Sequence, residues 1–298
     1  MLNKKVLCFG FCCVFLFAFS VKTAAQTTAT RTAELKKETV FGASRILIGQ
    51  STRTRAAGSF EITLQNRFWN TPDSRENQNE NARTFIADRI NSRLELGYSV
   101  SDRLTLGVGY ATRYESIDGF LKYKLIQQEE GTLQSPITIS VYQNGVFRSK
   151  TPGFADIDTD SGGLTTQLLV SRRFTENFSF QLAPSYVYGQ IADSFDNGVS
   201  KFFLGFGARY KVGKRVSLAS EYYYYINAPD DENVFGPFAI GVNWQVKQLI
   251  LQFSLTNADK LVEDKILGAT ARNFNFRDGN LHFGFQATYL LRFGKTRL

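Results

Sequence analysis

Residues 199–227 read VSKFFLGFGARYKVGKRVSLASEYYYYIN. Phe202, Leu204, Phe206, Ala208 and Tyr210 alternate with Gly205, Gly207 and Arg209, and the alternation resumes after Gly213-Lys214. Successive side chains of a β-strand point to opposite faces, so a period of two predicts strands with one apolar and one polar face. The short polar connection between the two halves predicts that these strands form an antiparallel pair.

The same alternation recurs over segments of about ten residues along most of the chain after residue 57. It predicts twelve strands, at 58–69, 90–100, 103–114, 118–127, 135–148, 162–174, 177–190, 199–212, 215–227, 235–246, 248–257 and 279–293. Short connections, such as Ser101-Asp102, alternate with longer ones that are rich in Asp, Asn, Gly and Arg. An even number of strands with one short-turn rim and one long-loop rim is typical of an up-and-down antiparallel transmembrane β-barrel.

A soluble β-sandwich is the main alternative, because its strands also alternate. Its outward face would be rich in Lys and Glu, whereas the polar face here is rich in Gly, Ser, Thr and Gln. Aromatic residues also gather at both ends of the predicted strands: Trp69, Tyr110, Tyr114, Tyr186, Tyr188 and Tyr222–Tyr225 toward the long-loop rim, and Tyr98, Tyr123, Phe174, Phe178, Tyr210, Trp244 and Phe293 toward the short-turn rim. Two aromatic belts are typical of two lipid–water interfaces and favour the membrane barrel.

The N-terminal residues 1–25 have the pattern of a secretory signal peptide. Met1–Lys5 is basic, Val6–Val21 carries no charge, and Thr23-Ala24-Ala25 offers small residues before a cut at Gln26. An uncleaved anchor helix is the alternative, but it would need about 20 apolar residues. The leader and the barrel pattern together predict an outer-membrane location.

Composition excludes several kinds of site. The chain has 298 residues, a formal net charge of +8, three Cys and one His. All three Cys (Cys8, Cys12 and Cys13) lie in the leader, so a chain that begins at Gln26 would have no disulfide, Cys–metal site or Cys nucleophile. A single His also excludes any site that needs two imidazoles from one chain.

The predicted organisation is a signal peptide at 1–25, a periplasmic lead-in or partial plug at 26–57, the barrel at 58–293 and a C-terminal tail at 294–298. Within the second part, Ser44–Ser51 precedes the first predicted strand. It is expected to form a short strand, a rim element or a piece folded into the lumen.

Four parts of the chain resemble an uncharacterised family of Gram-negative β-barrel proteins, classed as a domain of unknown function. They are Ser44–Ser51, Asp118–Leu125, Ala208–Lys211 with Lys214–Leu218 and Glu221–Tyr224, and Leu251–Asn257. The resemblance covers about residues 41–293. It implies an outer-membrane barrel and supplies no catalytic residues.

The predicted inner face carries more basic than acidic residues. The candidate lumen-lining residues are Arg67, Arg93, Glu95, Lys122, Lys124, Arg209, Glu221, His282 and Arg292. A cation-rich lining attracts anions, so one hypothesis is a narrow pore for small anionic solutes. The alternative is that ion pairs fill a closed lumen, as side chains do in eight-stranded barrels, and that the protein is a structural or docking barrel.

Two weaker candidates remain. His282 could activate a hydroxyl or water, but the sequence places no partner beside it, so we expect a polar lumen residue and no enzyme. Asp156, Asp158 and Asp160 have a spacing that suits Ca²⁺, but Gly162 stands one place late for the EF-hand pattern and Gln167 occupies its twelfth position. We therefore expect these carboxylates to be solvated in a loop.

No cofactor is expected. The expected partners are outer-membrane lipid and the barrel-insertion machinery, and a periplasmic or surface protein is a further candidate. No nucleic acid is expected, because a secreted barrel has no recognition helix.

Overall fold

The computed structural model describes residues 36–37, 39–70, 90–112, 115–130, 135–148, 162–189, 199–228, 235–267, 273–274 and 281–292. The predicted signal peptide at 1–25, the carboxylates Asp156, Asp158 and Asp160, and the tail at 294–298 lie outside these residues.

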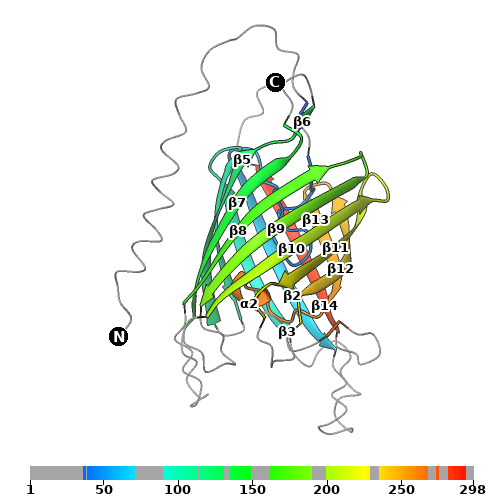
Figure 1. The fold of residues 1–298 in the computed structure, drawn as a ribbon. Coiled ribbons are helices and arrows are strands. Elements are labelled where there is room, and N and C mark those ends of the chain that lie inside the picture. Colours follow the sequence, from blue (N-terminus) through cyan, green and yellow to red (C-terminus); the bar gives the residue numbers. More distant parts are fainter. Residues whose placement is uncertain are drawn as a thin grey trace, which may run out of the picture. The chain divides into compact units, whose positions relative to one another are not determined.

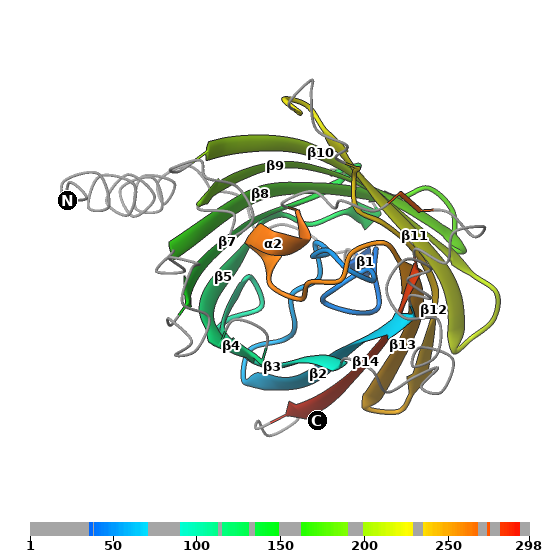
Figure 2. The ribbon, with the colours of Figure 1, turned by 90° about the horizontal axis from the view of Figure 1, so that it is seen from below.

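Twelve antiparallel strands of the described chain close into one barrel (Figures 1 and 2). They are β2 (Ser59–Asn70), β3 (Ile90–Ser99), β4 (Leu104–Ala111), β5 (Ser116–Ile126), β7 (Thr138–Arg148), β8 (Gly162–Arg173), β9 (Phe178–Gly189), β10 (Val199–Lys211), β11 (Val216–Tyr225), β12 (Phe238–Val246), β13 (Leu249–Thr256) and β14 (Leu281–Arg292). Each strand pairs with the next one along the chain, and β14 pairs with β2. The predicted up-and-down barrel is confirmed.

The pairing of β14 with β2 closes the ring. The register runs without interruption from Leu281 opposite Asn70 to Arg292 opposite Ser59. Midway along it, the hydroxyls of Thr63 and Thr288 lie 2.9 Å apart. Closure leaves the sheet without an edge, so every strand has hydrogen-bonding neighbours on both sides, which a hydrocarbon solvent requires.

The barrel is apolar outside and polar inside. On β3, Arg93 is fully buried and Glu95 is buried, whereas Leu94 between them is 46% exposed. The same alternation of an inward polar and an outward apolar residue runs along the other barrel strands. A soluble sandwich would bury its apolar face, so this distribution matches a barrel whose outer face contacts lipid.

Aromatic side chains are exposed at both ends of the strands, with one correction to the predicted belts. Tyr222 and Tyr224 are 40% and 54% exposed, but Tyr223 and Tyr225 are buried. Of the four tyrosines assigned to the belt at the long-loop rim, only Tyr222 and Tyr224 face lipid, because successive side chains of β11 must point to opposite faces. Inside the barrel, the Tyr225 ring stacks on Phe203 with their centroids 4.6 Å apart.

Two small elements accompany the barrel. Strands β1 (Lys36–Lys37) and β6 (Glu129–Glu130) form a two-stranded antiparallel sheet. The short helix α2 (Glu263–Ile266) follows β13, and it lies within the ring of strands when the barrel is viewed along its axis (Figure 2). Among the described residues, no helix is long and apolar enough to cross a bilayer.

The outward position of Leu94 gives a test of the lipid-facing assignment. Leu94→Arg places a charge midway along β3, where it would face hydrocarbon, and should lower the free energy of unfolding in lipid vesicles by about 2–4 kcal/mol. Urea titration followed by the mobility shift of the folded barrel on SDS gels measures this loss. Leu94→Ala, which removes apolar area without adding charge, should cost clearly less. An equal cost for both variants would contradict the assignment.

Candidate functional site

Residues 40–55 run inside the barrel, and we call them the inner segment (Figure 2). At its centre is a tight turn in which Arg45 and Gln50 form an antiparallel bridge and the Ile46 N–H donates to the Gly49 carbonyl at 3.0 Å. The side chains of Ile46, Leu47 and Ile48 are buried in one cluster with inward residues of the wall, among them Tyr223. The inner segment therefore packs against the barrel as part of its interior.

Gly49 is needed for this close approach. A Cβ at this position would stand 1.7 Å from the Tyr223 hydroxyl and 2.8 Å from Glu221 Oε1. Any side chain larger than hydrogen would push the turn away from β11.

Glu221 holds the turn to the wall. Its Oε2 accepts backbone N–H groups from three consecutive residues, Leu47 at 2.8 Å, Ile48 at 2.7 Å and Gly49 at 3.2 Å. Consecutive N–H groups that converge on one carboxylate form an anion-binding nest. A residue predicted only as a lumen charge thus supplies the acceptor for a whole turn of buried backbone.

A network of ion pairs connects the inner segment to the wall and to α2. The Arg45 guanidinium binds Glu95 of β3 at 2.9 Å and also binds Glu263 of α2. Arg93 pairs with the same Glu95 and, at 2.6 Å, with Asp118 of β5. Two arginines and three carboxylates, all buried, therefore bridge four separate parts of the chain: the inner segment, β3, β5 and α2.

Arg45 and Glu263 of this network are charged at neutral pH. Burial alone would raise the pKa of Glu263, but the positive charges of Arg45 and Arg93 outweigh burial and hold the pKa below its ordinary value. Burial alone would lower the pKa of Arg45, but Glu263 and Glu95 reverse this and raise it. Breaking the network by removing one partner would leave buried charges uncompensated, which typically costs several kcal/mol.

A second inward segment, residues 257–267, follows β13 and includes α2. Leu261, Val262, Ile266 and Leu267 are buried there, and Asp264 forms an ion pair with Arg148 at the end of β7. The sequence predicted only a long rim connection at this place. The signal that was missed is the pair of apolar dipeptides, Leu261-Val262 and Ile266-Leu267, in an otherwise polar connection.

The structure buries most of the candidate lumen-lining residues. Those that are buried on inward faces of strands are Arg67, Arg93, Glu95, Lys122, Lys124, Arg209, Glu221 and His282. Lys122 donates to the Ser44 carbonyl at 2.9 Å, which ties a third strand to the inner segment. Arg292 is exposed at the end of β14, so it lies at a rim and not in the enclosed interior.

Several interior charges were not among the sequence candidates. Asp118 and Arg148 are two of them, although each stands in phase with inward residues of its own strand. Within the described residues, no group of three or more His, Cys, Asp or Glu side chains is arranged to hold a metal ion.

A closed barrel with a lipid-facing apolar surface and a charged, polar interior defines an outer-membrane β-barrel protein. A family model described as "Membrane bound beta barrel domain (DUF5777)" matches residues 41–291, and the chain belongs to this family. The matched range covers residues 41–55 of the inner segment together with the barrel up to Leu291. No curated protein matches the chain.

Solved barrels with a related fold include three that are described as porins or channels. The NanC porin has a TM-score of 0.47 and 9% identity, covering 79% of this chain and 100% of that chain. The KdgM porin in complex with disordered oligogalacturonate has a TM-score of 0.44 and 9% identity, covering 79% and 99%. The COG4313 outer membrane channel from Pseudomonas putida F1 has a TM-score of 0.47 and 13% identity, covering 85% and 100%.

The nest at Glu221 can be tested by amide exchange. In Glu221→Ala, three buried N–H groups lose their acceptor, and each buried unpaired donor costs about 1–3 kcal/mol. Hydrogen–deuterium exchange of the Leu47–Gly49 amides should therefore accelerate at least about tenfold. In Glu221→Gln, which keeps an amide oxygen as acceptor, the acceleration should be smaller. Exchange that is unchanged in Glu221→Ala would show that the carboxylate does not hold the turn.

Proposed function

We propose that this outer-membrane barrel is a narrow channel for small anionic solutes. The inner segment closes the channel, and the channel opens only when that segment moves. The observation that carries the proposal is the polar character of the contact between the inner segment and the wall. Many hydrogen bonds and several ion pairs form this contact beside the apolar turn, and they can be replaced by water when the segment is displaced.

A barrel of twelve strands has an intermediate bore. Eight-stranded barrels are filled by their own side chains, and barrels of 16–18 strands hold a water channel. In a twelve-stranded barrel, wall side chains leave room that a short piece of backbone can occupy. Removal of that backbone would leave an aqueous path lined by polar groups.

Polar contacts to the inner segment come from many parts of the wall. Gln181 donates to the Gln50 carbonyl at 2.7 Å, Gln252 donates to the Ile46 carbonyl at 2.7 Å, and the hydroxyls of Thr52 and Ser171 lie 2.6 Å apart. The apolar turn opposes displacement, since full exposure of Ile46, Leu47 and Ile48 would cost about 4.5–9 kcal/mol at 1.5–3 kcal/mol each. The closed state should therefore dominate at rest, and opening should be rare without a stimulus.

The wall itself favours anions. Among the described barrel strands, seven buried residues are basic and four are acidic: Arg67, Arg93, Lys122, Lys124, Arg148, Lys201 and Arg209 against Glu61, Glu95, Asp118 and Glu221. With the inner segment displaced, the lining would carry a net positive charge in a low-dielectric tube, which concentrates anions.

The alternative function is a docking or structural barrel whose lumen is permanently filled. The network of Arg45, Glu95 and Glu263 favours this alternative, because it binds the two inward segments to each other as well as to the wall. The two functions differ in whether the inner segment ever leaves.

A disulfide lock distinguishes them. Thr52→Cys/Ser171→Cys should form a disulfide, because the two hydroxyl oxygens it replaces are 2.6 Å apart and both are buried. All three native Cys lie within residues 1–13, so a protein lacking the leader has no competing thiol. In planar bilayers the reduced variant should show anion-selective openings, and oxidation should abolish them reversibly.

The control is Thr63→Cys/Thr288→Cys, which links β2 to β14 across a similar distance without touching the inner segment. Its openings should be the same before and after oxidation. A second variant, Ile46→Ser/Leu47→Ser/Ile48→Ser, should open more often than wild type because its turn has less apolar surface to expose. If neither wild type nor the serine variant conducts above background, the channel is excluded and the docking barrel is favoured.

A further inference from the structure

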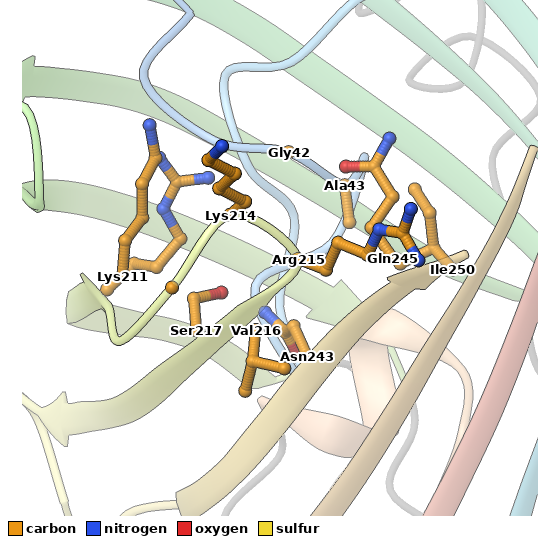
Figure 3. A pocket seen from close by; sticks show the side chains of 12 residues that line it. Gly42, Ala43, Lys211, Lys214, Arg215, Val216, Ser217, Asn243, Gln245 and Ile250 are labelled. Carbon is orange, nitrogen blue, oxygen red and sulfur yellow. The ribbon is translucent and has the colours of Figure 1, made fainter. Parts of the chain in front are cut away.

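A small basic cavity lies where the inner segment meets the turn between β10 and β11 (Figure 3). Its volume is about 70 Å³. The lining includes four cationic side chains, Arg209, Lys211, Lys214 and Arg215, and every lining residue belongs to the described chain. Gly42 and Ala43 of the inner segment form the opposite wall, and no carboxylate lines the cavity.

Arg209 points to a missing partner. It is only 6% exposed, and its Nε is buried without a hydrogen-bond partner. Its guanidinium lies over the Phe41 ring, 5.6 Å from the centroid, which positions the group without neutralising it. Arg209 thus lines the cavity with a guanidinium whose charge no lining carboxylate compensates, and its Nη1 faces the space beside Gly42, so the site can take an anion that the chain itself does not supply.

Gly42 keeps the cavity open. A Cβ at this position would stand 3.4 Å from Arg209 Nη1 and 3.9 Å from Gln245 Oε1, so a larger side chain would fill the space in front of the guanidinium. The backbone of Gly42 is not in the left-handed region, and its small size therefore matters here for space and not for conformation.

We propose that this cavity binds a phosphate-type oxyanion. Four cations around so small a volume favour a compact anion with more than one negative charge. Two guanidinium and two ammonium groups suit a tetrahedral group that accepts several hydrogen bonds, and the Ser217 hydroxyl adds a further polar group to the lining.

The bound anion would contact both the wall and the inner segment, because Arg209 belongs to β10 and Gly42 precedes the tight turn at Arg45–Gln50. Binding would therefore hold the start of the inner segment against the wall. The site does not depend on whether the barrel conducts, so its test is independent of the test for the channel.

Two sources could supply such a group: inorganic phosphate in solution, and the phosphate of a lipid headgroup at the same rim. The first arm of the experiment measures binding of inorganic phosphate to the full chain in a non-ionic detergent by equilibrium dialysis with radiolabelled phosphate. The second arm repeats the measurement in phosphatidylcholine vesicles and in vesicles that also contain phosphatidylglycerol.

We expect saturable binding of one phosphate per barrel in detergent. Arg209→Met, which removes the buried guanidinium, should weaken it at least tenfold. Gly42→Val should weaken it comparably while leaving every charge in place, and it covers the case in which Arg209→Met fails to fold. Arg103→Met is the matched control, because it removes one positive charge from another short turn, between β3 and β4, and it should change the affinity by less than about twofold.

Each outcome decides the proposal. Weaker phosphate binding in the phosphatidylglycerol vesicles would identify a lipid headgroup as a competing occupant, and equal binding in both vesicles would identify free phosphate; either supports the site. Two outcomes would overturn the proposal. One is the absence of saturable phosphate binding in detergent. The other is an equal loss of affinity in Arg103→Met and Arg209→Met, combined with full affinity in Gly42→Val.

Discussion

A lipid bilayer offers no hydrogen-bond partner to a peptide group, and the rest of this structure follows from that constraint. Each unsatisfied N–H or C=O in hydrocarbon costs several kcal/mol, so a sheet that crosses the membrane must close on itself. The pairing of β14 with β2 achieves this. Once the ring is closed, its outer face must be apolar, and the polar residues of every strand are confined to the interior.

Confinement of the polar residues creates the second problem, which is how to compensate charges away from bulk water. Some of the compensation comes from ion pairs within the wall, such as Arg93 with Asp118, and the rest comes from the two inward segments. Arg45 of the inner segment pairs with Glu95 of the wall and Glu263 of α2, and Glu221 is satisfied by backbone of the inner segment. The inward segments thus fill the barrel both by occupying its space and by compensating its charges. The basic cavity at Arg209 is one place where this compensation is incomplete.

The barrel could be predicted from the sequence because its determinant is local. The alternation of Phe202 to Tyr210 is visible in a single strand, and the predicted strands agree with the observed ones to within a few residues. The error at Tyr223 and Tyr225 arose where a run of identical residues hides the period of two. The arrangement of the interior could not be predicted, because Arg45 and Glu263 are 218 positions apart and meet only after the ring has formed. For Ser44–Ser51, the sequence left three alternatives open for the same reason.

The order of the chain also constrains how the protein can assemble. The inner segment immediately precedes β2, and β2 completes the ring only when it meets β14, which is the last strand to be synthesised. During biogenesis the eleven other strand pairings can form while the cylinder is still an open sheet, and the segment can settle against its concave surface from the side. After the seam is sealed, the only remaining route to the interior is lengthwise through a rim. Closure of the seam between β2 and β14 is therefore also the step at which the inner segment becomes enclosed in the barrel or stays outside it.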